Sequence, residues 1–238
     1  MRRAVYSLLA IGALAAGAVP SITRSLGPPS LVDRRVAQEE PQIGSTDVDS
    51  LLAGVPTVRN VVAAGEHRSL PGIAREVTSA TGGPGEGFAA RLTISAGSWF
   101  DPSDDGPIQR DGRDWNKLAG LHWTTGFATV ANHRNSALLA YRPAPSPDSF
   151  ELAFYQNPPA DGFRADALGT VAADSAVEVV ARCTAGTWTL HTTLAADTLT
   201  VVSEVDRDAW VRWNVNTWFG GNRVAPVRQE VSIRFAAF

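Results

Sequence analysis

The chain has a single cysteine and no excess of basic residues, and each absence excludes a class of protein. With Cys183 alone, no intrachain disulfide can form, so a disulfide-stapled scaffold is excluded. The net charge is −3 at pH 7 and no basic stripe runs along the chain, which argues against nucleic-acid binding. Cys183 lies in period-2 register with Val177, Val179 and Ala181, and this pattern predicts a small buried thiol.

Several catalytic patterns are missing as well. No predicted strand carries two carboxylates at the i, i+2 or i, i+4 spacing that would place them on one face, as glycosidases of sandwich architecture require. The four histidines lack the pair spacing of a zinc site, and no Gly-x-Ser-x-Gly nucleophile elbow is present. Glu151 and Glu178 are lone carboxylates that we expect on solvated strand faces. These absences favour binding over catalysis.

One loop is rich in carboxylates. Asp101, Asp104 and Asp105 fall within six residues and are candidate calcium ligands. The loop lacks the twelve-residue spacing that ends in a glutamate, so a surface turn is the better interpretation and no cofactor is predicted.

A long apolar run occurs only at the N-terminus. Arg2 and Arg3 precede an apolar stretch of about 16 residues, from Ala4 to Val19, which is typical of a secretory signal. The run is shorter than the roughly 20 residues that span a bilayer, although an uncleaved anchor stays open as an alternative. We therefore expect a secreted or cell-envelope-anchored, extracytoplasmic protein that meets the membrane only through this segment.

The composition divides the chain into three parts. Residues 1–26 are predicted to be a signal peptide or membrane anchor. Residues 27–56 are rich in proline and charge without a sustained period, and are predicted to be a flexible linker. Residues 57–238 are predicted to be one β-sandwich domain.

The predicted domain is dominated by period-2 alternation between clusters of Gly, Pro, Asp and Asn. In the last strand, Val231, Ile233 and Phe235 point one way and the polar residues between them the other. The other candidate strands are Thr57–Val62, Phe88–Ile94, Leu118–Trp123, Ser136–Arg142, Phe150–Tyr155, Ala176–Arg182 and Thr187–Thr192. Many short strands with turn signals predict an all-β sandwich of two antiparallel sheets.

Short sequence blocks in a fixed order carry a family resemblance. The blocks are Gly65-Glu66-His67, Asp114-Trp115-Asn116-Lys117-Leu118, Asn135-Ser136-Ala137, and Trp218-Phe219-Gly220-Gly221-Asn222 with Ala225-Pro226. Over about residues 57–238 they resemble an uncharacterised family of secreted bacterial proteins. The resemblance implies a concanavalin-like jelly roll, the fold of lectins, glucanases and some polysaccharide lyases, but a fold does not specify an activity. Val227 and Leu138 stand where that family usually has His and Arg, so chemistry that needs those side chains is not expected.

The aromatic residues suggest where a ligand could bind. Trp188 and Trp213 share strand faces with aliphatic residues and are predicted to be buried, whereas Trp210 and Trp218 lie beside loops and are predicted to be exposed. If Leu121 and Trp123 face the core, His122 must face away from it. The candidate ligand-binding residues are His122, Tyr155, Arg212, Trp218 and Asn222.

Three functions from different classes remain open. The leading hypothesis is non-catalytic binding of a glycan or another extracellular polymer, which needs only a shaped, partly aromatic surface. The alternative is a carbohydrate-active enzyme, a polysaccharide lyase before a glycoside hydrolase. In that case Tyr155, His122 and Arg91 would act as base and neutralisers and Glu151 as an alternative acid. The third is an envelope protein-interaction module without a glycan ligand.

Overall fold

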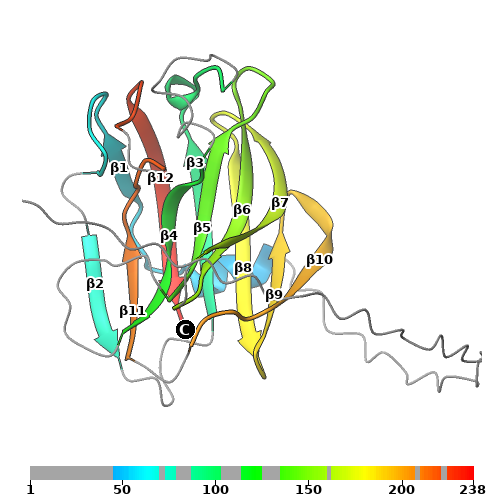
Figure 1. Ribbon diagram of the computed structural model, residues 1–238. Helices are drawn as coiled ribbons and strands as arrows, with labels where there is room; N and C mark the ends of the chain where they lie inside the picture. Colours follow the sequence, from blue (N-terminus) through cyan, green and yellow to red (C-terminus); the bar gives the residue numbers. More distant parts are fainter. Residues whose placement is uncertain are drawn as a thin grey trace, which may run out of the picture. The chain divides into compact units, whose positions relative to one another are not determined.

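Two antiparallel sheets of six strands each form the fold (Figure 1). The structure is a computed structural model that describes residues 45–69, 73–78, 87–102, 114–124, 135–159, 162–206, 210–220 and 224–238. In spatial order, sheet A contains β1 (Val58–Val62), β12 (Gln229–Ala237), β3 (Gly87–Ile94), β8 (Ala176–Thr184), β9 (Thr187–Thr192) and β10 (Ala195–Val202). Sheet B contains β2 (Ile73–Thr78), β11 (Trp210–Val215), β4 (Asn116–Thr124), β5 (Ser136–Pro143), β6 (Ser149–Asn157) and β7 (Arg164–Ala172).

The order of the strands confirms the predicted jelly-roll sandwich. The chain alternates between the sheets from β1 to β4, forms the meanders β4–β7 and β8–β10, and then crosses again for β11 and β12. Strand β12 therefore pairs with both β1 and β3. The first and the last strand of the domain are thus neighbours in sheet A.

The inward-facing residues of both sheets form one core, as the period-2 pattern predicts. Trp188 is fully buried at its centre, with ring centroids 5.2 Å from Phe154 and 6.3 Å from both Phe88 and Trp123. Cys183 is a buried free thiol in the same core, as predicted. Such aromatic clusters bury large apolar areas and dominate the stability of a core.

The strands that the sequence pattern did not predict are β2, β7, β10 and β11. Three of them, β2, β7 and β10, are edge strands of their sheets. An edge strand has a neighbour on one side only, and most side chains of β10 are exposed, so its sequence carries little alternation.

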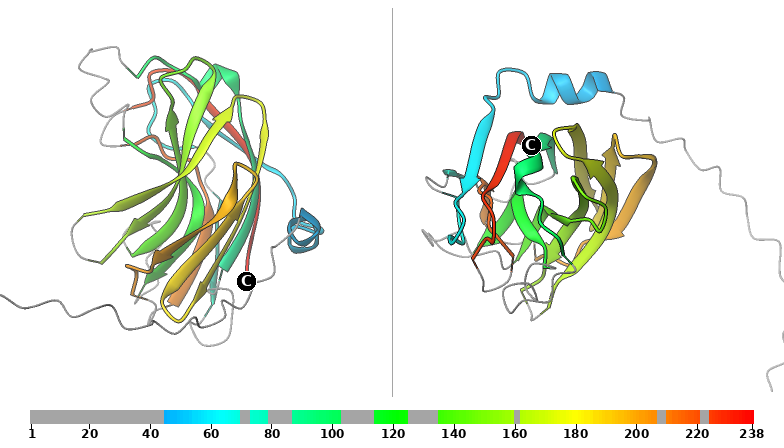
Figure 2. Two further views of the ribbon diagram at one scale, coloured as in Figure 1. Left: turned by 90° about the vertical axis from the view of Figure 1, so that its right-hand side faces the viewer. Right: turned by 90° about the horizontal axis from the view of Figure 1, so that it is seen from above.

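The folded unit begins earlier than predicted. Helix α1 (Ser45–Leu51) lies outside the sandwich (Figure 2), and Val48 and Leu52 are buried against Ala89 and Val180 of sheet A. The side chain of Arg234 donates hydrogen bonds to the backbone carbonyls of Leu52 and Val55. The C-terminal end of the predicted 27–56 linker is therefore part of the domain, because two apolar side chains and an arginine attach it to sheet A.

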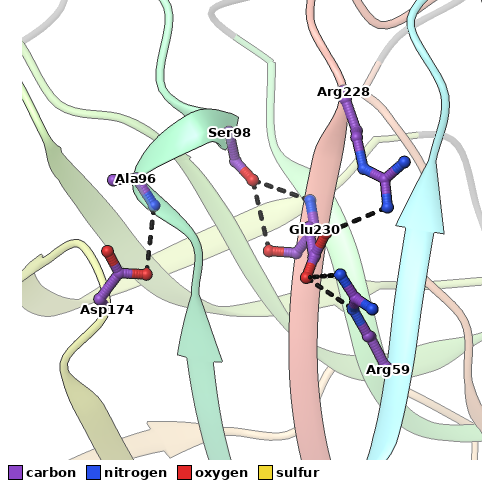
Figure 3. Close-up of polar contacts among 6 residues, drawn as sticks. All are labelled: Arg59, Ala96, Ser98, Asp174, Arg228 and Glu230. Atoms are coloured by element: carbon purple, nitrogen blue, oxygen red, sulfur yellow. Dashed lines mark hydrogen bonds and ion pairs between the residues drawn. The ribbon is translucent and has the colours of Figure 1, made fainter.

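A short polar cluster fixes the end of β3 against β12 (Figure 3). The turn η1 (Ala96–Ser98) follows β3, and the Ser98 hydroxyl accepts a hydrogen bond of 2.8 Å from the Glu230 amide. The Glu230 carboxylate accepts hydrogen bonds from Arg59 and Arg228, and these lower its pKa although burial opposes the shift. The backbone that leads into Trp99 is thus held in place.

The predicted signal or anchor segment, residues 1–26, lies outside the described residues. Among the helices that the structure describes, none is long and apolar enough to cross a membrane.

Candidate functional site on the outer face of sheet B

The site lies on the outer face of sheet B, the side turned away from sheet A. Residues paired across antiparallel strands point to the same face. Lys117 on β4 pairs with Ala140 on β5, which pairs with Ala153 on β6. Beyond β4, Trp218 forms bridges to both Lys117 and Arg68. One row across the sheet therefore contains Arg68, Trp218, Lys117, Ala140, Ala153 and Ala167.

Lys117 occupies the middle of this row and is the only lysine in the chain. Its Nζ atom lies 4.9 Å from the centroid of the Tyr155 ring and 3.8 Å from Oδ2 of Asp114. The side chain is 11% exposed. Burial lowers the pKa of the amine, and the charge and hydrogen bond of Asp114 oppose that shift. Alanines in the same row leave room for a long side chain to lie across the sheet.

Tyr155 is buried beneath a second aromatic ring. Phe163 stacks on it with ring centroids 5.1 Å apart and an interplanar angle of 17°. Tyr155 is 4% exposed, whereas Phe163 is 55% exposed. Burial, and then the negative charge of Asp114, raises the pKa of the Tyr155 phenol, so it keeps its proton at neutral pH. The exposed Phe163 ring was not among the predicted ligand-binding residues.

Trp218 is buried, so the prediction that it is exposed is wrong. Its backbone amide and carbonyl pair with the carbonyl and amide of Lys117 at 2.9 and 3.0 Å, which draws the segment onto the edge of β4. The guanidinium carbon of the exposed Arg68 lies 5.9 Å from the centroid of the Trp218 ring. The accessible group at this end of the row is therefore the arginine.

His122 points away from the core, as predicted, because Leu121 and Trp123 on either side of it are core residues. It is nevertheless only 6% exposed, and it pairs in register with Arg212 of β11. The structure therefore brings His122, Tyr155 and Trp218 to one face and places the backbone of Arg212 there. The side chain of Arg212 and the whole of Asn222 lie outside the described residues.

The sequence blocks behind the family resemblance meet around Lys117. The amide of Gly220 donates to Oδ1 of Asn116 at 2.6 Å, and the amide of Phe219 donates to the carbonyl of His67 at 3.0 Å. A Cβ at Gly220 would lie 3.0 Å from the carbonyl carbon and oxygen of Asp114. Glycine allows this close backbone approach, whereas a Cβ would require the neighbouring backbone to shift by a few tenths of an ångström. These blocks build the frame that positions Lys117.

The Asn135-Ser136-Ala137 block is also structural. Asn135 has a positive φ of 52°, and its side-chain amide donates to the carbonyls of Trp123 and Asp206 at 3.2 and 2.8 Å. Its Oδ1 accepts a hydrogen bond of 2.7 Å from the amide of Asp206. Asn135 thus ties the end of β4 to the segment before β11.

Three charged residues differ from their predicted roles. Arg91 lies on sheet A and forms ion pairs with Glu178 and with Asp49 of α1, so it cannot act together with Tyr155. Glu178 and Glu151 are partly buried and ion-paired rather than lone solvated carboxylates. Glu151 lies 2.6 Å from Nη2 of Arg142. Each ion pair lies on the outward face of its strand, where both charged groups keep partial contact with solvent.

The predicted calcium candidates are only partly described. Asp101 is exposed, and Asp104 and Asp105 lie outside the described residues. In the described ranges no group of three or more His, Cys, Asp or Glu side chains could hold a metal ion. The interpretation of this loop as a surface turn, with calcium binding as the less favoured alternative, stays a prediction.

Comparison with known proteins gives a likeness in fold. No family model and no curated protein matches the chain. Among solved structures, it is similar to the alginate lyase from Klebsiella pneumoniae, with 9% identity and a TM-score of 0.43 over 64% of this chain and 59% of that one. It is also similar to alginate lyase vAL-1 from Chlorella virus, with 13% identity and a TM-score of 0.43 over 78% of this chain and 86% of that one. LamAcat from Zobellia galactanivorans has 10% identity and a TM-score of 0.42 over 78% of this chain and 77% of that one.

These similarities concern the β-sandwich and do not extend to activity. The chain spans less than two thirds of the Klebsiella enzyme that it matches. The resemblance to an uncharacterised secreted family stays a prediction that rests on the sequence blocks.

Proposed function

We propose that the outer face of sheet B binds an acidic polysaccharide outside the cytoplasm without cleaving it. The observation that carries the proposal is the row in which Arg68 lies over Trp218 and Lys117 lies over Tyr155. Two cations supported by aromatic rings, in one row across a sheet, can pair with successive carboxylates of a polymer. The extracytoplasmic location follows from the predicted signal or anchor at residues 1–26.

Three groups on this face have distinct roles in the proposal. Arg68 is exposed and offers a planar guanidinium that can bind a carboxylate through two hydrogen bonds. Phe163 is exposed and offers a ring on which the C–H face of a sugar can stack. Lys117 supplies a positive charge in a partly dry environment, where its attraction to an anion is screened less than at an open surface.

The state of Tyr155 argues against the role of catalytic base that the sequence offered for it. Burial raises the pKa of the phenol, so it is a proton donor at neutral pH and a poor base. Glu151 is held by Arg142 and is not a free acid. A shaped, charged surface is sufficient for the proposed role.

A polysaccharide lyase is the second candidate, favoured by His122, Tyr155 and Lys117 sharing one face. In such a reaction His122 would remove the proton from C5 of a uronate while Lys117 neutralised its carboxylate. The C4–O bond would then break as the C4–C5 double bond formed, and Tyr155 would give its proton to the leaving oxygen. An interaction module without a glycan ligand is the third outcome that the experiment below distinguishes.

Affinity electrophoresis in gels containing alginate, polygalacturonate or neutral dextran tests the proposal. We expect retardation by at least one of the acidic polymers that clearly exceeds any retardation by dextran. Arg68→Gln should weaken it about 3- to 10-fold, which corresponds to roughly 1 kcal/mol. The matched control Arg59→Gln removes an exposed arginine of sheet A and should leave retardation unchanged.

The same polymers decide between the candidates. A time-dependent rise in absorbance at the unsaturated-uronate band would replace the binding proposal by the lyase. Absence of retardation in both acidic polymers would overturn both glycan functions and favour the interaction module.

A further inference from the structure

A second site lies at one end of the sandwich, where the segment after η1 meets the β5–β6 loop. It is a cavity of about 480 Å³, within the range of small-ligand pockets. It is lined by Trp99, Asp101, Pro102, Arg142, Pro143, Pro145, Pro147 and Glu151. Of the predicted ligand-binding residues whose side chains the structure describes, His122, Tyr155 and Trp218 do not line it, and neither Lys117 nor Arg68 does.

The apolar wall of this cavity is preformed. Nε1 of Trp99 donates a hydrogen bond of 3.1 Å to the carbonyl of Ala144, which holds the indole against the proline-rich β5–β6 loop. The preceding turn is fixed by the hydrogen bonds between Ser98 and the backbone of Glu230 (Figure 3). Prolines add fixed φ angles. Little conformational entropy is then lost when a ligand enters.

The polar wall is a compensated ion pair. Nε and Nη2 of Arg142 both approach Oε2 of Glu151 at 2.6 Å, and the guanidinium carbon lies 4.4 Å from the centroid of the Trp115 ring. The side chains of Arg142 and Glu151 are 37% and 32% exposed, so both can make further hydrogen bonds. The exposed Asp101 lines the cavity as well, so among the described lining residues the one cation, Arg142, is already paired with a carboxylate.

We propose that this cavity binds an uncharged pyranose residue. The Trp99 ring and the proline rings can cover the C–H face of the sugar. Glu151 can accept from one hydroxyl while Arg142 donates to its neighbour, because adjacent hydroxyls of a pyranose present a donor and an acceptor side by side. Because Arg142 is already paired with Glu151, a uronate would gain no new ion pair from the described lining residues. The cavity is thus proposed to bind a neutral sugar, whereas the outer face of sheet B is proposed to bind an acidic one. The assignment of the cavity does not rest on the proposed function of that face.

The test is a titration with neutral and acidic hexasaccharides, followed by tryptophan fluorescence and calorimetry. The neutral probes are cellohexaose, laminarihexaose and mannohexaose, and the acidic probe is hexaguluronate. We expect at least one neutral probe to bind with a Kd of about 0.1–1 mM, typical of a single weakly held sugar site of about 5 kcal/mol. Hexaguluronate should not compete with it.

Variants locate the binding. Trp99→Phe and Glu151→Gln should each raise the Kd for the neutral probe at least about 5-fold, since each removes one wall contact. Asp197→Asn, the same loss of a carboxylate at an exposed position of β10, should leave it unchanged. If Trp99→Phe does not fold, as judged by circular dichroism, Glu151→Gln decides alone.

The outcomes separate this proposal from the previous one. Failure of all three neutral probes, or binding that both variants leave intact, overturns the pyranose cavity even when alginate is still bound. Loss of alginate binding with neutral binding intact leaves the cavity standing and removes only the proposed function of the outer face.

Discussion

Lys117 reaches across strand β5 to place its Nζ atom 4.9 Å from the centroid of the Tyr155 ring on β6. The contact joins the only lysine of the chain to a buried phenol, and Asp114 lies 3.8 Å from the same amine. Arg91 on sheet A, by contrast, forms ion pairs with the carboxylates of Glu178 and Asp49. The Lys117 amine is thus held on the outer face of sheet B between a carboxylate and an aromatic ring.

The titration of Lys117 gives the first prediction. Reductive methylation with ¹³C-formaldehyde labels only this side chain and the N-terminal amine, so its pKa can be read by NMR. We expect a pKa below the ordinary 10.5, because burial disfavours the ammonium form. A value at or above 10.5 would show that Asp114 and the Tyr155 ring outweigh burial.

The sign of the linked stability change follows from this shift. Between the folded pKa of Lys117 and 10.5 the unfolded chain binds more protons than the folded chain, so this residue makes unfolding less favourable as pH rises through that window. Lys117→Met lacks this contribution. The difference in unfolding free energy between wild type and variant should therefore shift in favour of wild type from neutral to alkaline pH, as measured by urea unfolding.

The ring pair of Tyr155 and Phe163 gives the second prediction. Phe163→Ala should expose Tyr155, weaken retardation by acidic polysaccharide and destabilise the fold by about 0.5–1.5 kcal/mol, the contribution of a stacked aromatic pair. Val202→Ala shortens another exposed hydrophobic residue, on sheet A, and serves as the control. Unchanged polysaccharide binding in Phe163→Ala would limit the ring to a structural role.

The N-terminal boundary gives the third prediction. Removal of residues 1–41 should leave the unfolding free energy unchanged, because the compact unit begins at Gln42. Removal of residues 1–56 deletes α1 and should cost about 2–5 kcal/mol through loss of the buried Val48 and Leu52. Chemical denaturation of the two truncated proteins measures the difference. Equal unfolding free energies would show that α1 does not stabilise the domain and belongs to the predicted linker.

Gly220 gives the fourth prediction. Gly220→Ala places a Cβ 3.0 Å from backbone atoms of Asp114 and Trp115, which cannot move without shifting the start of β4. We expect a loss of about 1–3 kcal/mol, the usual cost of overpacking a close contact. At Gly97 an added Cβ would meet only Oγ of Ser95, at 3.9 Å, so Gly97→Ala is the control. Equal melting temperatures for the two variants would contradict the close-approach argument. The neighbouring Gly221 lies outside the described residues.

The sequence by itself determined the fold class and most of the strands. Val231, Ile233 and Phe235 alternate with polar residues because one face of β12 packs on the core. Burial of that face requires an apolar residue at every second position. The buried thiol of Cys183 and the inward Trp188 were predictable for the same reason. Where burial is one-sided and weak, as on the edge strand β10, the pattern is faint and the strand was missed.

Tertiary structure alone decided the candidate site. Arg68, Lys117 and Trp218 are far apart in the chain and become neighbours only through strand register. The sequence could place His122 on the correct face, but it could not show that Trp218 is covered or that Arg91 belongs to the other sheet. Alternation along one strand specifies a face, whereas the partners on that face are set by hydrogen-bonded pairing between distant segments, which local periodicity does not encode.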